Sequence, residues 1–377
     1  MYFEFSENVN DFLKIILKNA QMQDKRVFFV GGIVRDNILN NPILDIDLLL
    51  LGNAIEFVAS LPESITVKSI HEDFCTAKLS YNGLEIDIAS SRKECYPNSG
   101  CLPVVSKIGV SLEEDVLRRD FTVNSIYCEL TLIENEICYQ LIDLVGGVDD
   151  IKAKTLRALH SNSYIDDPTR IIRGVGFKYR FGFDFSGLDK NLIESYLENI
   201  DYSYMSYDRN CKVIAKTLDS SYRDEIFKEI IFSEYYKIIN SRKLDVDFEY
   251  LQKIIADFKM NHGEICELYL KVLINRHIDD FVLCEKTKCL DMFLKMKKVD
   301  LAYYFYKTKD IRLDWYLSKK DISLNISGYD LIDLGYQQGQ IVGKILNELK
   351  AKKLDEPEKY PDKDAEINWV LKEFPNK

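Results

Sequence analysis

The chain has 377 residues, with 46% hydrophobic and 29% charged side chains and a formal net charge of −11. These values predict a folded protein of two or more domains, and no apolar run approaches the ~20 residues of a membrane-spanning helix. The N-terminus lacks a basic-then-apolar signal sequence, so we expect a cytoplasmic protein. The negative charge argues weakly against a nucleic-acid partner, although residues 168–180 contain four basic side chains and no acidic one.

The cysteines are an odd number and scattered along the chain. They form no Cys-x-x-Cys pair, and none of the four histidines clusters near them. This spacing favours reduced, mostly buried thiols over a zinc site. The nine cysteines stand at positions 75, 95, 101, 128, 138, 211, 266, 284 and 289.

The first part of the chain mixes strand and helix patterns. The apolar run 26–30 ends at Gly31-Gly32, which predicts a strand followed by a turn. Residues 33–40 have helical spacing, and the run "IDLLLLG" (46–52) has the pattern of a strand.

A second helix and a hairpin follow. Residues 53–61 have helical spacing, with Asn53 as the expected N-cap. Residues 75–81 and 84–90 alternate apolar and polar side chains around Asn82-Gly83, which is a strong hairpin signal. The sequence therefore predicts a small α/β domain with at least one antiparallel hairpin.

Helical periodicity replaces the strand patterns after residue 155 and continues to about residue 350. We find no fixed-period repeat and no low-complexity linker. The charged segment 350–366 is expected to be loosely ordered. An α/β head followed by a long helical region is the predicted organisation.

Two acidic pairs stand out in the head. Asp45 and Asp47 are two residues apart at the start of a predicted strand, so their side chains are expected on one face. Such carboxylates repel each other unless a cation lies between them. Glu85 and Asp87 offer a further acid on a neighbouring strand. Carboxylate oxygens suit Mg²⁺, and this combination predicts a two-metal site for nucleotidyl transfer.

The turn at Gly31-Gly32 lies between a predicted strand and a predicted helix. It would expose backbone N–H groups at a helix N-terminus, where phosphate oxygens bind well. Arg35 could add a charge-assisted contact to the same phosphate. Taken alone, the two glycines indicate only a tight turn, and no dinucleotide fingerprint or P-loop accompanies them.

Four ordered motifs carry a resemblance to a known family. "VGGIVRD…DIDLLL", "RRDFTVNSI", "LIDLVGGVDDIKAKTLRAL" and "DDPTRIIRGVGFKYRFGF" lie in residues 30–183. Together they resemble the class II tRNA nucleotidyltransferases, which include CCA-adding enzymes, CC-adding and A-adding specialists and bacterial poly(A) polymerases. Residues 327–355 add a weaker resemblance. Without the family, "RRDFTVNSI" would indicate an ordinary amphipathic helix start.

The resemblance implies a fold and a division into domains. The head is expected to be an α/β nucleotidyltransferase domain of the DNA polymerase beta superfamily, with a mixed sheet, followed by an all-α neck, body and tail. We expect the head at 1–155, the neck at 156–220, the body at 221–315 and the tail at 316–377.

The resemblance also implies roles for the acidic residues and the glycine turn. Gly31, Gly32 and Arg35 would contact the nucleotide phosphates. Asp45 and Asp47 would hold the metal ions, with Mg²⁺ as the expected cofactor. Asp87 is favoured over Glu85 as the third catalytic carboxylate.

Further positions follow from "RRDFTVNSI" and the neck. Arg119 would contact the bound nucleotide, while Asp120 and Asn124 shape the sugar pocket. Arg173 would contact the nucleotide phosphates. The lysines of the tail are expected candidates for tRNA contact, namely Lys344, Lys350, Lys352 and Lys353.

Asp167 and Arg170 carry two interpretations. Asp167 before Pro168 is a good helix N-cap, with proline at the first helical position. The two charged residues are three apart, so both can also project from one side of a first turn. In the family such a pair reads the base edge, accepting CTP and ATP and rejecting UTP and GTP.

The chain departs from the family pattern at two positions. Gly176 stands where a second arginine is usual, which removes one expected contact to the nucleotide. Either Lys178 or Arg180 supplies that contact instead, or the affinity for the nucleotide is reduced. Asp208 stands where glutamate is usual, in a segment that is equally typical of a capped amphipathic helix. In the family, the region 91–110 is a mobile loop needed for the switch from C to A addition.

The sequence therefore predicts a Mg²⁺-dependent enzyme that adds CCA to the tRNA 3′ end from CTP and ATP. An A-adding or CC-adding specialist, or a poly(A) polymerase, would share nearly every motif. A protein of this fold that only binds RNA is the remaining alternative. The predicted partners are tRNA and the two nucleotides, with no membrane.

Overall fold

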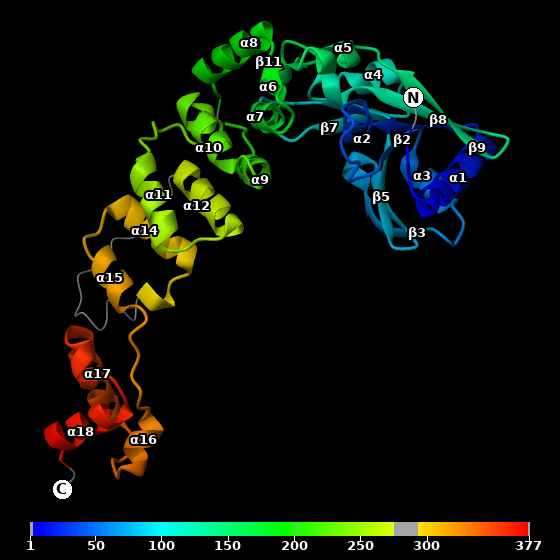
Figure 1. Ribbon diagram of the computed structural model, residues 1–377. Helices are drawn as coiled ribbons and strands as arrows, with labels where there is room; N and C mark the ends of the chain where they lie inside the picture. Colours follow the sequence, from blue (N-terminus) through cyan, green and yellow to red (C-terminus); the bar gives the residue numbers. More distant parts are fainter. Residues whose placement is uncertain (1–2, 202, 275–292, 376–377) are drawn as a thin grey trace. The chain divides into compact units, whose positions relative to one another are not determined.

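The computed structural model describes residues 3–201, 203–274 and 293–375, which form two compact units, Met1–Lys243 and Leu244–Lys377 (Figure 1). Cys284 and Cys289 lie outside the described residues. In the described part, no helix is long and apolar enough to cross a membrane.

A seven-stranded mixed sheet forms the framework of the first unit. The strand order is β3-β4-β5-β2-β1-β8-β9, with β2 and β5 parallel and the other neighbours antiparallel. This is the predicted α/β head with a mixed sheet. Its strands are β1 (Arg26–Val30), β2 (Asp47–Leu51), β3 (Thr66–His71), β4 (Thr76–Tyr81), β5 (Leu84–Ser90), β8 (Tyr127–Ile133) and β9 (Glu136–Ile142).

Helices cover this sheet because its central strands are apolar on both faces. Val27–Val30 of β1 and Leu48–Leu50 of β2 are buried. Helix α1 packs on β1 and β8, and α3 packs on β4 and β5 (Figure 1). The head helices are α1 (Glu7–Met22), α2 (Gly32–Ile38), α3 (Ala54–Ala59), α4 (Leu112–Val116) and α5 (Gly147–Lys152).

Local signals in the head are largely confirmed. The Asn53 side chain accepts hydrogen bonds from the N–H groups of Ile55 and Glu56 and caps α3. Asn82 and Gly83 both have positive φ and join β4 to β5. "RRDFTVNSI" forms only a 3₁₀ turn at Thr122–Asn124 instead of a helix start, because its backbone turns at once into β8.

The region 91–110 contains a small sheet of its own. Strands β6 (Arg92–Cys95) and β7 (Val104–Ile108) pair antiparallel in a separate two-stranded sheet. Gly100, at the tip between them, donates its N–H to the carbonyl oxygen of Ile165 and accepts from the N–H of Ser206. The hairpin tip is thus attached to the helical part of the first unit.

Helices dominate the first unit after residue 155. Helix α7 (Thr169–Phe181) packs on α9 and α10, and the short strands β10 (Thr155–Leu156) and β11 (Asp184–Phe185) pair beside it. The strand β11 was not predicted. The other helices are α6 (Ser163–Asp166), α8 (Gly187–Glu198), α9 (Tyr207–Leu218) and α10 (Arg223–Phe232).

The second unit is helical throughout its described residues. Its C-terminal helices enclose an apolar cluster that includes Leu331, Ile345 and Val370. The described helices are α11 (Phe248–Asp257), α12 (His262–Ile274), α14 (Lys298–Thr308), α15 (Leu313–Lys319), α16 (Gly328–Asp333), α17 (Gln340–Asp355) and α18 (Lys363–Glu373).

The charged segment 350–366 is ordered, so the prediction of a loose tail was wrong. Lys353 and Glu366 are buried and form an ion pair with 2.5 Å between Nζ and Oε1. Glu366 also accepts hydrogen bonds from the N–H groups of Asn325 and Ile326. These charges are buried because they satisfy one another and the backbone. Lys353 is consequently not available to contact RNA.

Candidate functional site

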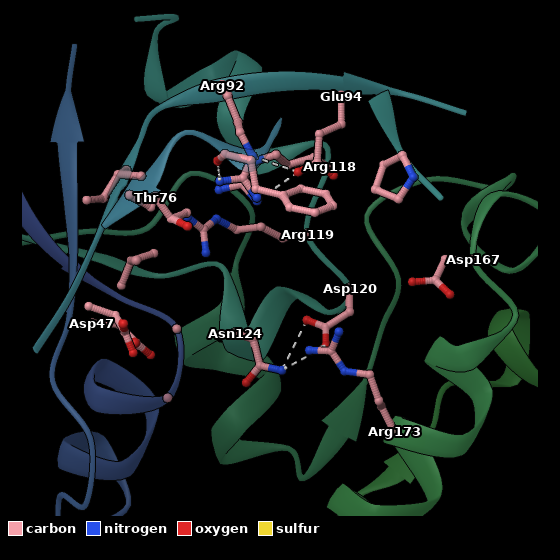
Figure 2. A pocket seen from close by; sticks show the side chains of 18 of the residues that line it. Asp47, Thr76, Arg92, Glu94, Arg118, Arg119, Asp120, Asn124, Asp167 and Arg173 are labelled. Atoms are coloured by element: carbon pink, nitrogen blue, oxygen red, sulfur yellow. Dashed lines mark hydrogen bonds and ion pairs between the residues drawn. The ribbon is translucent and has the colours of Figure 1, made fainter. Parts of the chain in front are cut away.

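A cleft of about 560 Å³ lies in the first unit and gathers the sequence-predicted residues. Its wall combines β1, β2, β5 and β6 with the segment 118–124 and the N-terminal half of α7 (Figure 2). Asp45 does not line it. The predicted residues that do are Gly31, Gly32, Arg35, Asp47, Asp87, Arg119, Asp120, Asn124, Asp167, Arg170 and Arg173.

Asp47 and Asp87 lie next to each other on the two parallel strands of the sheet. They are Cα partners in the pair β2–β5, so their side chains leave the same face. Burial by the surrounding protein raises the pKa of Asp47, and the negative charges of Asp87 and Asp45 raise it further. Glu85 is exposed and lies outside the cleft.

Asp45 lies just before strand β2, which begins at Asp47. Its side chain is exposed in the connection that follows Pro42. The N–H of Asp87 donates to the carbonyl oxygen of Ile46, so bonding to β5 extends one residue before the start of β2. The charge of Asp45 raises the pKa of Asp47, so the two carboxylates interact.

The glycine turn lines the cleft beside these acids. Gly31 has a φ of +76°, in the left-handed region that favours glycine, and Gly32 begins α2. The backbone of this turn therefore faces the space next to Asp47.

Arg35 is buried behind the turn and contacts other protein groups. Its guanidinium donates to both carboxylate oxygens of Asp36 and to Oδ1 of Asn124. It also lies 4.3 Å from the ring centroid of Phe181. These contacts hold α2 against the cleft wall.

A buried carboxylate organises two arginines of the cleft. Asp115 is fully buried and accepts hydrogen bonds from Nε of Arg118, from Nε and Nη2 of Arg119 and from the hydroxyl of Tyr127. Burial alone would raise the pKa of Asp115, but the charges of Arg119 and Arg118 hold it well below its usual range.

Arg92 extends this group of cations along the cleft. Its Nε donates to Glu94 at 2.7 Å, and Arg118 lies 3.5 Å from the same carboxylate. Sequence reasoning named Arg119 but missed Arg92, Arg118 and Asp115. The available signal was the spacing of "DVLRR", which puts both arginines three and four residues after Asp115.

The middle of the cleft is polar and closely paired. Asp120 accepts a hydrogen bond from the Asn124 amide and forms an ion pair with Arg173, with 2.6 Å between Oδ2 and Nη2 (Figure 2). Burial alone would raise the pKa of Asp120, but the charge of Arg173 and the hydrogen bond from Asn124 lower it below its usual value. The Arg173 side chain itself is 45% exposed, so it can also reach a ligand in the cleft.

Asp167 lies across the cleft from Asp47 (Figure 2), and Arg170 also lines the cleft. Both are buried, with Asp167 accepting from the N–H and hydroxyl of Thr169. Arg170 donates to the hydroxyl of Ser163 and to the carbonyl oxygen of Arg118. The prediction of Asp167 as the N-cap was wrong, because α7 begins at Thr169 with Pro168 as its N-cap.

Gly176 lies on α7 outside the cleft. A Cβ atom there would come within 3.0 Å of the Thr217 methyl carbon. Lys178 pairs with Glu229 at 2.9 Å, and Arg180 is half exposed, 3.9 Å from Asp36. Neither Lys178 nor Arg180 lines the cleft.

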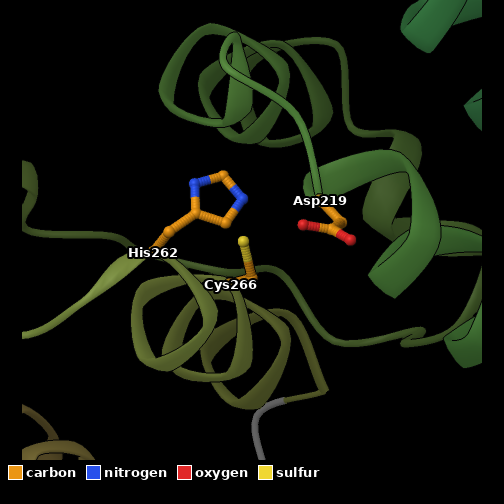
Figure 3. Close-up of side chains that lie close together, drawn as sticks. All are labelled: Asp219, His262 and Cys266. Atoms are coloured by element: carbon orange, nitrogen blue, oxygen red, sulfur yellow. The ribbon is translucent and has the colours of Figure 1, made fainter.

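The burial of the cysteines and the position of His262 both differ from the prediction. Of the seven cysteines that the structure describes, only Cys128 and Cys266 are buried, so the thiols are not mostly buried. His262 and Cys266 are one turn apart on α12, with ligand atoms within 4.8 Å of each other (Figure 3). A histidine does therefore lie beside a cysteine. Asp219, also drawn in Figure 3, belongs to the first unit.

The head matches a known domain. The model of the poly(A) polymerase head domain matches residues 27–157, which hold the sheet, the acidic pair and the cleft residues Arg92, Arg118 and Arg119. Arg170 and Arg173 lie beyond the matched residues. A solved structure of a CCA-adding enzyme in an apo form superposes with a TM-score of 0.74 at 22% identity, covering 98% of this chain and 97% of that chain. This likeness shows that the two chains share a fold.

Two curated relatives are similar in sequence. The A-adding tRNA nucleotidyltransferase of Aquifex aeolicus is 32% identical over 259 residues, which make up 68% of this chain but 29% of the relative. The CCA-adding enzyme of Staphylococcus saprophyticus is 29% identical over 327 residues, covering 79% of this chain and 74% of the relative. The match thus spans less than a third of the Aquifex protein.

The fold and cleft define a nucleotidyltransferase head joined to a helical region. The head-domain match and the two relatives together show that the chain belongs to the tRNA nucleotidyltransferase and poly(A) polymerase family.

Proposed function

We propose that the protein is a cytoplasmic, Mg²⁺-dependent tRNA nucleotidyltransferase that adds CCA to the tRNA 3′ end from CTP and ATP, without a nucleic-acid template. The observation that carries this proposal is the placement of Asp47 and Asp87 in one cleft with Arg118 and Arg119. Adjacent carboxylates suit a divalent cation, and guanidinium groups suit a triphosphate.

The donor set fits Mg²⁺. The raised pKa of Asp47 reflects burial and unrelieved repulsion from Asp87 and Asp45, which a divalent cation would relieve. Asp47 and Asp45 would hold the metal, with Asp87 beside them as the third acid. The bound metal would supply Lewis-acid activation of the attacking hydroxyl and charge stabilisation at the α-phosphate.

The remaining cleft residues would bind and orient the nucleotide. Arg119, fixed by Asp115, would contact the triphosphate together with the backbone at Gly31-Gly32. Asp120 and Asn124 would shape the sugar pocket. Arg173 would add a phosphate contact from its exposed side.

Asp167 and Arg170 would read the base edge. Cytosine and adenine present an amino donor beside a ring-nitrogen acceptor, whereas uracil and guanine present a carbonyl acceptor there. A carboxylate acceptor beside a guanidinium donor matches the first pattern and repels the second. Exposed Lys344 and Lys352 on α17 are candidates for tRNA contact.

An A-adding specialist is the second candidate. The relative from Aquifex aeolicus carries that name and has higher identity to this chain than the CCA-adding relative from Staphylococcus. Both activities need the same cleft, so the motifs do not separate them.

The test is single-nucleotide extension. The purified protein is offered tRNAs that end at the discriminator base, after one C and after CC, and an unrelated RNA, with CTP, ATP or both and Mg²⁺. We expect growth of the bare tRNA to CCA and no further. Extension only of the CC-ended tRNA would mean an A-adding enzyme, and long A tails on any RNA a poly(A) polymerase. No extension of any RNA would contradict the proposal and leave only RNA binding.

A further inference from the structure

Arg209, on the first turn of α9, is the cationic partner of Asp167. Its Nη2 donates to Oδ2 of Asp167 at 2.6 Å, and the two residues are 42 positions apart in the sequence. The Asp167 side chain is 4% exposed and that of Arg209 23% exposed, so water screens this ion pair only in part. Both residues line the cleft.

The remaining bonds of Asp167 fix which of its acceptor positions are taken. An ionised carboxylate has about four acceptor positions, two on each oxygen. Oδ1 accepts from the N–H of Thr169 at 3.0 Å and from its hydroxyl at 2.6 Å, so both of its positions are used. Oδ2 accepts from Arg209, and no second donor to Oδ2 occurs among the described residues.

One acceptor position of Asp167 is therefore left, on the oxygen that Arg209 holds. An ionised carboxylate can only accept a hydrogen bond, so Oδ2 suits a base amino group and not the carbonyl-bearing edge of uracil or guanine. The ion pair with Arg209 fixes the direction in which Oδ2 points. Without Arg209, Thr169 alone would hold the carboxylate, and Oδ2 would be free to turn away from the base edge.

A second bond anchors Arg209 on the other side. Its Nη1 lies 3.4 Å from the carbonyl oxygen of Cys101, in the tip between β6 and β7. That tip is itself bonded to Ile165 and Ser206 through Gly100. The guanidinium is thus held from two elements and not only by its own helix.

We propose that Arg209 is a positioning residue for nucleotide selection, because it holds Oδ2 of Asp167 in place and leaves one acceptor position on that oxygen for a base amino group. This inference rests on the proposed function, in which Asp167 reads the base. It adds a residue that does not itself need to touch the nucleotide.

The test compares Arg209→Met, which removes the charge and keeps the length, with Arg209→Lys, which keeps a charge and one donor. Lys212→Met is the matched control, since Lys212 is exposed one turn further along α9 and outside the cleft. Each protein extends tRNA with CTP or UTP, and the ratio of the two kcat/KM values is measured. CTP and UTP binding are measured in parallel by calorimetry without RNA.

For Arg209→Met, we expect the CTP to UTP ratio to fall tenfold or more, about 1.4 kcal/mol of discrimination. Arg209→Lys should restore part of the ratio, and Lys212→Met should match the wild type. In an Asp167→Asn background, Arg209→Met should cause no further loss, because the carboxylate it acts on is absent. A structural role alone would not produce this dependence.

An unchanged CTP to UTP ratio in Arg209→Met, in extension and in binding, would overturn the inference. So would equal losses for Arg209→Met with and without Asp167→Asn. Failure of the proposed function looks different, because the wild type would then extend no RNA while calorimetry would still report whether Arg209 controls nucleotide choice. If Arg209→Met does not fold, Arg209→Gln, which also removes the charge, takes its place, and an unchanged CTP to UTP ratio in Arg209→Gln overturns the inference.

Discussion

Lys78 and Asp87 form an ion pair across β4 and β5, with 3.4 Å between Nζ and Oδ2. The same ammonium group lies 3.7 Å from Oε2 of Glu85. On its other side, Asp87 is paired in register with Asp47 on β2. Asp87 thus lies between a cation on one neighbouring strand and a carboxylate on the other. Lys78 offsets part of the negative charge of β5, but the repulsion at Asp47 remains.

Asp47→Asn should stabilise the metal-free protein and remove its response to Mg²⁺. The change takes away one of two adjacent negative charges, so thermal unfolding of the first unit in EDTA should occur at a higher temperature. For the wild type, Mg²⁺ at 100 times its Kd should add about 2.7 kcal/mol of stability. Thermal scans with and without Mg²⁺ measure both effects. An Asp47→Asn protein that still gains stability from Mg²⁺ would exclude Asp47 as a ligand.

Asp87→Asn and Glu85→Gln form a matched pair that identifies the third acid. Both side chains are more than half exposed and both contact Lys78, so their local charge environments are similar. Only Asp87 lines the cleft. We expect Asp87→Asn to lower kcat at least 100-fold, about 2.7 kcal/mol of transition-state stabilisation, and Glu85→Gln to stay within about twofold. The reverse order of effects in the tRNA extension assay would assign the role to Glu85.

Asp115→Asn should raise the KM for the nucleoside triphosphate and destabilise the first unit. The change leaves Arg118 and Arg119 without their buried counter-ion, which costs about 3 kcal/mol in the free energy of unfolding. Urea unfolding and nucleotide titrations of the extension rate give the two values. Glu113→Gln is the control, because Glu113 is exposed on the same helix. A stable Asp115→Asn protein with unchanged KM would show that the arginines do not depend on Asp115.

The local parts of the site could be predicted from the sequence because their geometry depends on a few consecutive residues. The Gly31-Gly32 turn, the hairpin at Asn82-Gly83 and the cap at Asn53 follow from backbone preferences. The choice of Asp87 over Glu85 agrees with the register of β5 against β2. Asp45 lies just before β2, at a strand start whose exact position alternation alone does not reveal.

Partners that meet only in the folded chain could not be predicted in this way. Arg209 reaches Asp167 across 42 residues, and Lys353 pairs with Glu366 across 13. In the sequence, nothing marks any of these four charged residues as the partner of another. The burial of Lys353 depends on how α17 and α18 pack, which has no local signature.

The pH dependence of stability in the second unit should be sensitive to Asp310. Hydrogen bonds from Arg312 and Tyr304 lower the pKa of Asp310 to about 2. Because the folded pKa lies below the unfolded value of about 3.9, Asp310 stabilises the fold above pH 4, and this contribution is lost as the pH falls towards 2.

Asp310→Asn should therefore lose about 2 kcal/mol at pH 6, and its deficit relative to the wild type should shrink at pH 3. Denaturant unfolding at both pH values measures this difference. Asp314→Asn serves as the control, since its side chain is 88% exposed. A deficit that stays constant with pH would mean that the charge of Asp310 is not responsible.

Gly174→Ala should destabilise the helix that carries Arg170 and Arg173. A Cβ atom at Gly174 would lie 2.3 Å from Cζ of Phe185 and 3.1 Å from Cζ of Phe121, both in buried rings. Alanine improves helix propensity by about 1 kcal/mol, but overpacking of a core costs about 1–3 kcal/mol. The clash is close and the rings are enclosed, so we expect the overpacking cost to be larger.

Gly187→Ala is the matched control, because a Cβ atom at Gly187 on α8 meets no atom within 4 Å and its φ is not positive. We expect it to stabilise the protein by about 0.4–1 kcal/mol. Urea unfolding of the full-length variants compares the two changes. If Gly174→Ala were as stable as Gly187→Ala, Phe185 would have to move away from α7. The position of α7, and with it the side chains of Arg170 and Arg173, would then not depend on close packing at Gly174.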